Sequence, residues 1–260
     1  MLVTTAIVLR RSDYRDYDRM MTLLSPGYGR IDAVARGVKR PTSSLISATE
    51  MFCAGEYAFV TTKGGLTLKD CTIVESHYPI REDYDRLIHG CYLLNLILFA
   101  ALPGERCDPL FELALRALAH LSYSALPPEL ITAMFEMHFA QMLGQSPMVS
   151  HCMHCGKPAE GLQTMFDARL GGVLCPECGR IGAGLPITEG ARRIMQKAPR
   201  ARFETVELLE ARAEWPEAAA HIRRFLVTRV DLRNHTPPTL FGEAGTGAGA
   251  RGDAKGLPPL

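Results

Sequence analysis

The sequence predicts an α+β protein of several domains, in which a small N-terminal β-barrel precedes an all-α domain that a four-cysteine zinc ribbon interrupts. Short, alternating, β-branched segments fill the first 79 residues, and apolar segments with helical spacing follow them. Two C-x-x-C pairs lie inside the helical region. We therefore place the barrel at 1–79, the helical domain at 80–147 and 183–241, and the zinc-ribbon module at 148–182. A Gly/Ala-rich tail at 242–260 is expected to be disordered.

The barrel is predicted from five short strands. Alternation of apolar and polar residues indicates strands at 4–10 and 30–36, and an apolar run at 20–24 indicates another, with a turn at 25–29. Residues 55–62 and 66–76 are expected to form a hairpin around Lys63-Gly64-Gly65. Five short strands with a longer central loop favour a small closed barrel, for which the OB-fold is one candidate.

The helical domain is predicted from runs with helical periodicity. Residues 83–102 are apolar on nearly all sides and should form the central core helix, and 110–121 form a second helix. A third begins at Pro128, and Gly144 with Pro147 ends it. Helices resume after Thr188, a good N-cap. The last helix, at about 217–233, should bury one face made of Ile222, Phe225, Leu226 and Val230.

The two C-x-x-C pairs predict a structural zinc site. Zinc prefers four ligands in tetrahedral geometry, and two thiolates three residues apart on a tight turn supply two of them. The predicted ligands are Cys152, Cys155, Cys175 and Cys178. A glycine follows each pair, Gly156 and Gly179, and we expect positive φ at both. Because four thiolates leave no open coordination position, the zinc should hold the fold and do no chemistry.

Other interpretations of the cysteines are weaker. Disulfides would need an oxidising compartment, and a thioredoxin-like site uses a single C-x-x-C. A zinc deaminase needs an H-x-E motif, which is absent. His151 or His154 remains an alternative ligand in place of one cysteine.

Composition describes an ordinary globular protein of the reducing cytoplasm. The hydrophobic fraction is 47% and the net charge is only +1, so any nucleic-acid surface must be a local patch. The longest apolar run, at 91–102, is too short to span a membrane.

No catalytic machinery is evident. The sequence has no P-loop, no G-x-G-x-x-G after a strand, no G-x-S-x-G and no metalloprotease helix. Asp13, Asp16 and Asp18 are interleaved with Arg15 and Arg19, which disfavours a magnesium site. Binding is therefore the predicted class of function, and no enzymatic activity is expected.

A basic loop follows the third predicted strand. Between Arg30 and Arg40 there are four basic residues and one acid, and hydroxyl residues come next. A barrel strand that leads into such a loop is typical of small barrels that bind a nucleic-acid backbone. The predicted DNA-binding residues are Arg30, Arg36, Lys39 and Arg40, with Arg10, Arg11 and Arg19 as an extension. Arg15, Lys63, Lys69 and three tyrosines, Tyr14, Tyr17 and Tyr28, could add to this surface, and Arg223 with Arg224 is an alternative one. The rival interpretation is a solvated loop whose charges only keep the protein soluble, since residues 1–80 carry ten basic and eight acidic side chains.

In this order the segments resemble the RecO family of bacterial recombination mediators in DNA repair. The similarity is carried by 6–11, by Tyr14 to Arg19, by Tyr28-Gly-Arg30, by Val34-Ala-Arg-Gly37 and by the spacing of the two C-x-x-C-G pairs. A glutamate usual in the family near Asp18 is absent, because Arg15-Asp-Tyr17 stands there.

The resemblance implies an N-terminal OB-fold that binds single- and double-stranded DNA. It also implies annealing of complementary strands without ATP, including strands coated by single-stranded DNA-binding protein (SSB), whose C-terminal tail would bind the helical domain. RecR is an implied partner in loading RecA at gaps, and the nucleoid is the implied location. Two rivals from other classes are a zinc-ribbon scaffold without a DNA role and a metal-dependent nuclease.

Overall fold

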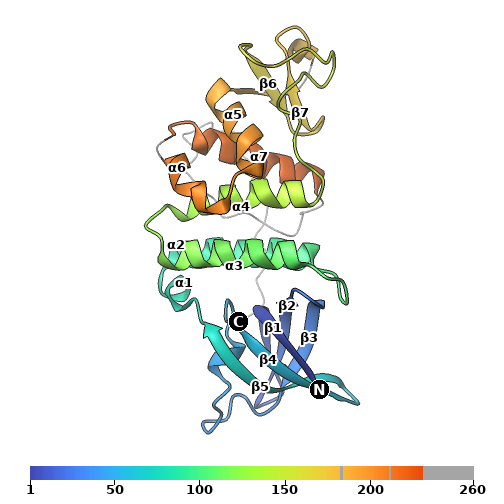
Figure 1. The fold of residues 1–260 in the computed structure, drawn as a ribbon, viewed down its shortest axis with the longest axis vertical. Helices are drawn as coiled ribbons and strands as arrows, with labels where there is room; N and C mark the ends of the chain where they lie inside the picture. The colour runs from blue at the N-terminus through green and yellow to red at the C-terminus, as the bar shows by residue number, and fades with distance from the viewer. Residues whose placement is uncertain (182–183, 211, 231–260) are drawn as a thin grey trace, which may run out of the picture.

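The protein is described by a computed structural model that covers residues 1–181, 184–210 and 212–230. The predicted disordered tail and the end of the last predicted helix, including Arg233, lie outside the described residues. Figure 1 shows an elongated arrangement, with the N-terminal strands at one end, a stack of helices in the middle and a small sheet at the other end. Among the described residues, no helix combines the length and apolarity that crossing a bilayer requires.

The N-terminal strands form a closed, OB-like barrel in the order β1-β2-β3-β5-β4. The strands are β1 (Leu2–Tyr14), β2 (Asp18–Ser25), β3 (Gly29–Ala35), β4 (Ala54–Thr62) and β5 (Gly65–Glu75). All five predicted strands are confirmed, but β1 is longer than expected. Its first half pairs with β4 and its second half with β2, and a register shift between Val8 and Arg10 lets one strand serve both neighbours.

The barrel interior is closed by its own apolar side chains, because alternate residues of each strand point inward. Large buried side chains in this interior include Met21, Leu23, Tyr57 and Phe59. The hydroxyl of Tyr57 donates a hydrogen bond to the carbonyl of Ala48 at 2.9 Å, so the polar atom of this buried ring has a partner.

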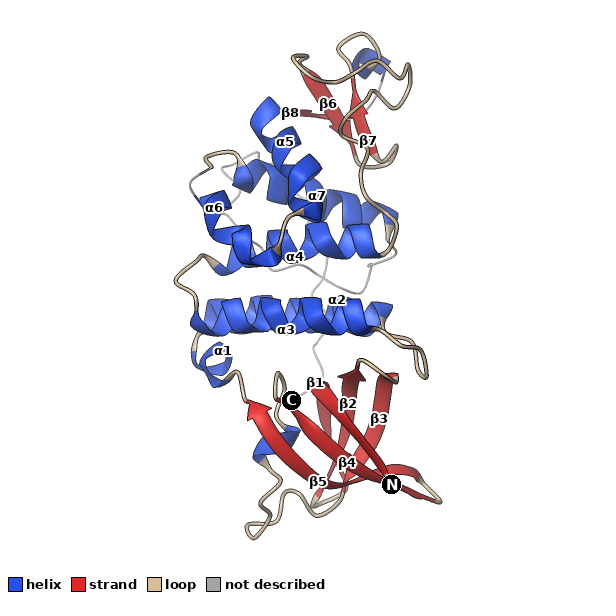
Figure 2. Ribbon diagram, viewed as in Figure 1, coloured by secondary structure: helices blue, strands red, loops and turns tan. Residues whose placement is uncertain are grey.

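Four helices follow: α1 (Tyr78–Glu82), α2 (Tyr84–Ala100), α3 (Asp108–Tyr123) and α4 (Pro128–Met142). The helices predicted over 83–102, over 110–121 and from Pro128 are confirmed within a few residues. Asp83 caps α2, since its carboxylate accepts the backbone N–H of Arg86 at 2.8 Å. In Figures 1 and 2, α2 and α3 lie across one end of the barrel and α4 lies on their other side.

The second part of the helical domain contains α5 (Glu189–Lys197), α6 (Glu207–Glu210) and α7 (Trp215–Arg229). Thr188 caps α5 as predicted, with its hydroxyl accepting the N–H of Ala191 at 3.2 Å. Short 3-10 segments lie at Ser47–Thr49, Gly179–Ile181, Ala198–Arg200 and Phe203–Val206. The predicted apolar face of α7 is buried, and α7 begins two residues before the expected start at 217.

The ribbon contains a three-stranded sheet in the order β7-β6-β8. The strands β6 (Thr164–Asp167) and β7 (Gly172–Leu174) form an antiparallel hairpin between the two C-x-x-C pairs, and β8 (Leu185–Ile187) pairs with the other side of β6. The ring centroid of Phe166 lies 5.0 Å from that of His221 and 6.5 Å from that of Phe225. The ribbon is therefore packed on α7 and shares its core with the helices.

The barrel joins the helical domain through the β2–β3 turn. Backbone hydrogen bonds connect Arg30 N to Leu102 O at 3.2 Å and Gly104 N to Tyr28 O at 2.9 Å. Gly29 has a φ of +61°, and a Cβ on it would lie 2.0 Å from the carbonyl oxygen of Leu102. Only glycine fits this position, because any side chain would be both strained and in collision with the helical domain.

Candidate nucleic-acid interface and metal centre

The end of the barrel remote from the helices brings together two loops that are far apart in the sequence. The β1–β2 hairpin turn covers 15–17, and β3 ends at Ala35, where the basic loop begins. These loops, together with the last residues of β1, form what we call the barrel tip.

The basic loop has a fixed shape at its base. Gly37 has a φ of +63°, and its N–H donates to Asp18 Oδ1 at 2.7 Å. The N–H of Lys39 donates to the carbonyl of Tyr17 at 3.0 Å. The hairpin turn and the basic loop are thus joined by two hydrogen bonds, which positions the side chains of 36–40 on the barrel tip.

Three of the predicted DNA-binding cations are exposed and make no ion pair within the described part of the chain: Arg10, Arg36 and Arg40. The guanidinium of Arg40 lies 5.4 Å from the ring centroid of Tyr17. Tyr14 and Tyr17 are 39% and 51% exposed, so both rings are accessible at the barrel tip. Arg36 and Arg40 therefore offer available positive charge on the barrel tip, and Arg40 lies beside an accessible aromatic ring, as does the exposed Arg15, 5.1 Å from the ring centroid of Tyr14.

Other predicted cations are paired with carboxylates. Lys39 Nζ lies 2.8 Å from Asp13 Oδ2, and Arg11 Nε lies 3.1 Å from Glu50 Oε2. Arg19 is only 8% exposed, with Nη1 2.8 Å from both Glu50 Oε1 and Thr49 Oγ1. This environment gives Arg19 a structural role between β2 and the segment that precedes β4.

Arg30 lies apart from the other predicted cations. It is the second residue of β3, next to the junction with the helical domain, and Arg36 follows the other end of that strand. Six residues of strand separate them by roughly 20 Å. Its Nε is 3.7 Å from Asp32 Oδ2. The structure does not bring Arg30 to the barrel tip.

The four cysteines of the ribbon converge on one point. The sulfur atoms of Cys152, Cys155, Cys175 and Cys178 all lie within 4.8 Å of one another. Cys152 and Cys175 are buried, and Cys155 is exposed. No other group of three or more potential ligands of the His, Cys, Asp and Glu types gathers among the described residues. Four sulfurs at this separation fit a tetrahedral metal ion.

The surroundings of two of the thiols shift their pKa values in opposite directions. Burial alone would raise the pKa of Cys152, but backbone N–H groups of Cys155, Cys175 and His154 lower it to about 6. The neighbouring sulfur of Cys175, followed by burial, raises the pKa of Cys178 to about 12. One thiolate is thus favoured and another is disfavoured, and a metal ion would remove the repulsion among them.

The two glycines after the pairs serve different purposes. Gly156 has the expected positive φ, +72°. The expectation for Gly179 is wrong: its φ is not in the left-handed region, and it begins a 3-10 segment. Glycine is needed there for space, because a Cβ would lie 2.9 Å from Cγ of Met165. This contact forms only when β6 packs against the second C-x-x-C turn.

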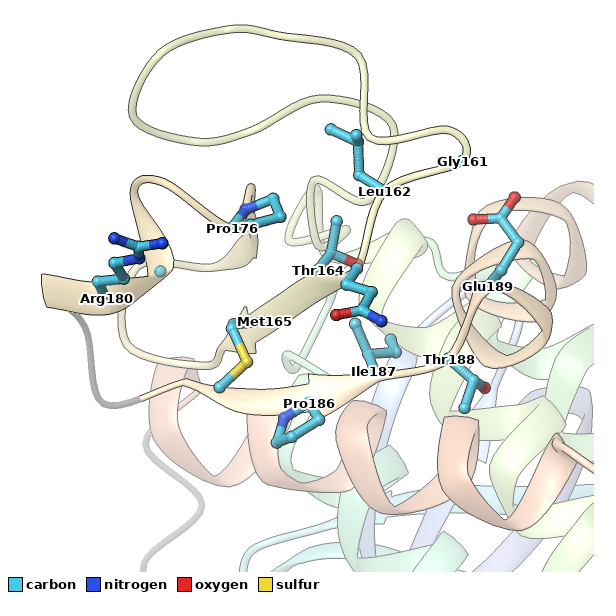
Figure 3. Close-up of a pocket in the computed structure, with 12 residues that line it drawn as sticks. Gly161, Leu162, Thr164, Met165, Pro176, Arg180, Pro186, Ile187, Thr188 and Glu189 are labelled. Carbon is cyan, nitrogen blue, oxygen red and sulfur yellow. The ribbon is translucent and has the colours of Figure 1, made fainter.

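A groove of about 790 Å³ lies beside that turn. Figure 3 shows Leu162, Met165 and Pro186 lining it, with Pro176 and Arg180 contributed by the second C-x-x-C segment. Most of the exposed surface that lines the groove is apolar, although polar and charged residues such as Arg180 and Glu189 also contribute to it. The β6–β8 pairing forms one wall, and the β6–β7 pairing places the strand that leads into Cys175.

A buried ion pair in the helical domain was not predicted from the sequence. Arg223 Nε lies 3.0 Å from Oε1 of Glu136, which is fully buried, and the hydroxyl of Tyr92 donates to the same oxygen at 2.7 Å. Arg223 was an alternative DNA contact, but this pairing turns it into the interior, and Arg224 stays exposed. The sequence does hold a signal for this ion pair, because Glu136 is an acidic residue among apolar neighbours in the middle of α4.

Comparison with known proteins covers all of these parts. The family described as Recombination protein O N terminal matches residues 1–77, and Recombination protein O C terminal matches residues 81–237. A "DNA repair protein RecO" of Syntrophomonas wolfei is 32% identical over 207 residues, which are 79% of this chain and 82% of the relative. Another, of Pelotomaculum thermopropionicum, is 30% identical over 263 residues, which are 94% of this chain and 96% of the relative. Since both halves of the family match in order over the barrel, the helices and the ribbon, the chain belongs to the recombination protein O family.

Proposed function

We propose that this protein is a recombination mediator of DNA repair that binds single- and double-stranded DNA and anneals complementary strands without ATP, including SSB-coated strands. Membership of the family, together with relatives named DNA repair proteins, supports this role. By the same resemblance, RecR would be its partner in loading RecA at gaps, the SSB tail would bind its helical domain, and it would associate with the nucleoid.

The observation that carries the proposal is the exposed charge of the barrel tip. Arg36 and Arg40 are exposed on a loop whose base is held by Gly37, and Tyr17 provides an accessible ring beside Arg40. Cations placed in this way attract phosphates, and aromatic rings stack on unpaired bases. Because two DNA strands repel one another, a surface that screens both lets complementary bases meet before the strands separate.

No bond is made or broken in this activity, so the protein would act without catalytic residues. The four-cysteine site would hold one structural zinc ion. Zinc favours four thiolates and would supply no chemistry there, since no open position remains for a substrate. Cys152 and Cys175 would hold it from the buried side of the ribbon.

The test is annealing of two complementary dye-labelled oligonucleotides, without nucleotide. The variant Arg36→Ala/Lys39→Ala/Arg40→Ala is expected to lose most of the rate. Its affinity for single-stranded DNA should also depend less on salt, with a log–log slope smaller by about 2, because each lost phosphate contact contributes about 0.7.

The matched control removes three cations from the helical domain, as Arg116→Ala/Lys197→Ala/Arg200→Ala. This control should anneal like the wild type. Equal rates in all three proteins would place the DNA surface away from the barrel tip. No annealing and no DNA binding by the wild type would favour a scaffold without a DNA role, and cleavage of DNA on adding magnesium would favour a nuclease.

A further inference from the structure

Asp13 forms an ion pair with Lys39 on the barrel tip. Its Oδ2 lies 2.8 Å from Lys39 Nζ, and its Oδ1 lies 3.7 Å from Arg19 Nε. The side chain of Asp13 is 59% exposed and that of Lys39 is 29% exposed, so the pair lies at the surface of the barrel tip. The hydrogen bond from Lys39 lowers the pKa of Asp13, and the charges of Lys39, Arg19 and Arg11 lower it further. The carboxylate is therefore an anion seated between cations.

The guanidinium of Arg19 and the backbone of Lys39 are held by groups other than Asp13. Arg19 is held by Glu50 and Thr49, each at 2.8 Å, and the backbone N–H of Lys39 is bonded to Tyr17 O. Asp13 lies on β1 directly opposite Arg19, where the backbone of β1 is paired with that of β2. Moving its side chain away would therefore expose a formed cationic site and would not require the loop or the barrel to rearrange.

We propose that Asp13 is a built-in competitor for the phosphate oxygens of nucleic acid at Lys39. This inference rests on the proposed DNA binding and adds a regulating residue to the same site. In free protein the carboxylate neutralises Lys39; when DNA arrives, a backbone phosphate displaces it. Because exposed ion pairs are weak, the exchange costs little, and the carboxylate is at hand to replace the phosphate when a strand leaves. Such competition suits a protein that must release the duplex it has annealed.

The inference predicts that Asp13→Asn binds single-stranded DNA more tightly than the wild type, chiefly through slower dissociation. Removing any acidic residue near bound DNA raises the affinity for DNA somewhat. Asp16→Asn is therefore the control variant. Asp16 lies in the adjacent turn, is exposed and makes no ion pair in the described part of the chain. Asp13→Asn should exceed Asp16→Asn by about two- to fivefold, which is the range expected for one exposed ion pair.

The experiment measures the Kd and the dissociation rate of a labelled oligothymidine for both single variants in two backgrounds, wild type and Lys39→Gln. Asparagine is close in size to aspartate, and circular dichroism checks that each variant is folded. If Asp13 acts through Lys39, its extra gain disappears in the Lys39→Gln background, where the two asparagine variants should agree.

The outcomes separate the inference from the proposed function. Wild-type binding with equal affinities for Asp13→Asn and Asp16→Asn would overturn the inference and leave the proposed function standing. An extra gain that persists without Lys39 would also overturn it, because the carboxylate would then act on another group. No DNA binding by any of the proteins at low salt would overturn both.

Discussion

Replacing Arg223 by methionine should destabilise the helical domain strongly without affecting DNA binding. The substitution removes the ion-pair partner of Glu136, which is fully buried and keeps only the hydroxyl of Tyr92 at 2.7 Å. Breaking a buried pair on one side costs about 3–5 kcal/mol, and the remaining hydrogen bond from Tyr92 favours the lower end, about 3 kcal/mol. With a urea dependence of about 2 kcal/mol per molar, the unfolding midpoint would fall by about 1.5 M.

The loss of stability caused by Arg223→Met should grow as the pH rises. Burial already raises the pKa of Glu136, against the opposing influence of Arg223 and Tyr92. Without Arg223 the folded-state pKa rises further above the unfolded value of about 4.3. The folded variant then favours the protonated carboxyl, so the loss of stability relative to wild type is small near pH 5 and grows as the pH rises through the new pKa.

The assay is urea unfolding followed by fluorescence of Trp215, the single tryptophan, which begins α7. Arg224→Met is the control, because Arg224 is exposed on the same helix, and its change should stay within about 0.5 kcal/mol. A loss below about 1 kcal/mol for Arg223→Met at about pH 8, or a loss that is the same at about pH 5 and about pH 8, would refute the argument that Glu136 depends on Arg223.

Two further predictions follow from the site and the domain junction. Purified protein should contain one zinc ion per chain, measured by elemental analysis. Cys175→Ser should lose the zinc and expose the ribbon to proteolysis, whereas the control Cys91→Ser should keep it. Full zinc in Cys175→Ser would contradict the proposed ligand set. Gly29→Ala should lower the stability by at least about 2 kcal/mol in thermal unfolding, because it combines a left-handed φ with a collision at Leu102 O. Gly27→Ala, in the same turn with open space around it, should be nearly neutral, and equal effects at both glycines would count against a tight junction.

Strands, helices, caps and the two C-x-x-C turns can be predicted from the sequence, because they depend on local spacing. The C-x-x-C pairs at Cys152 and Cys175 bring two sulfurs together on each tight turn whatever the rest of the fold does. Strand alternation and the cap residues Asp83 and Thr188 are also local, since a side chain and the backbone it caps lie within three residues. The five strands of the barrel and the N-cap at Thr188 were confirmed, and the four predicted ligands lie together.

Only the tertiary structure decided which charges are available at the surface. Lys39 pairs with Asp13 across 26 positions and Arg223 pairs with Glu136 across 87, and no pattern in the sequence indicates either pairing. Basic residues that look alike in the sequence therefore have different environments: Arg36 is exposed, Arg19 is buried, and Arg30 lies at the other end of its strand. The physical reason is that burial and pairing of a charge depend on segments that folding brings together, whereas strands, turns and caps depend on neighbours along the chain.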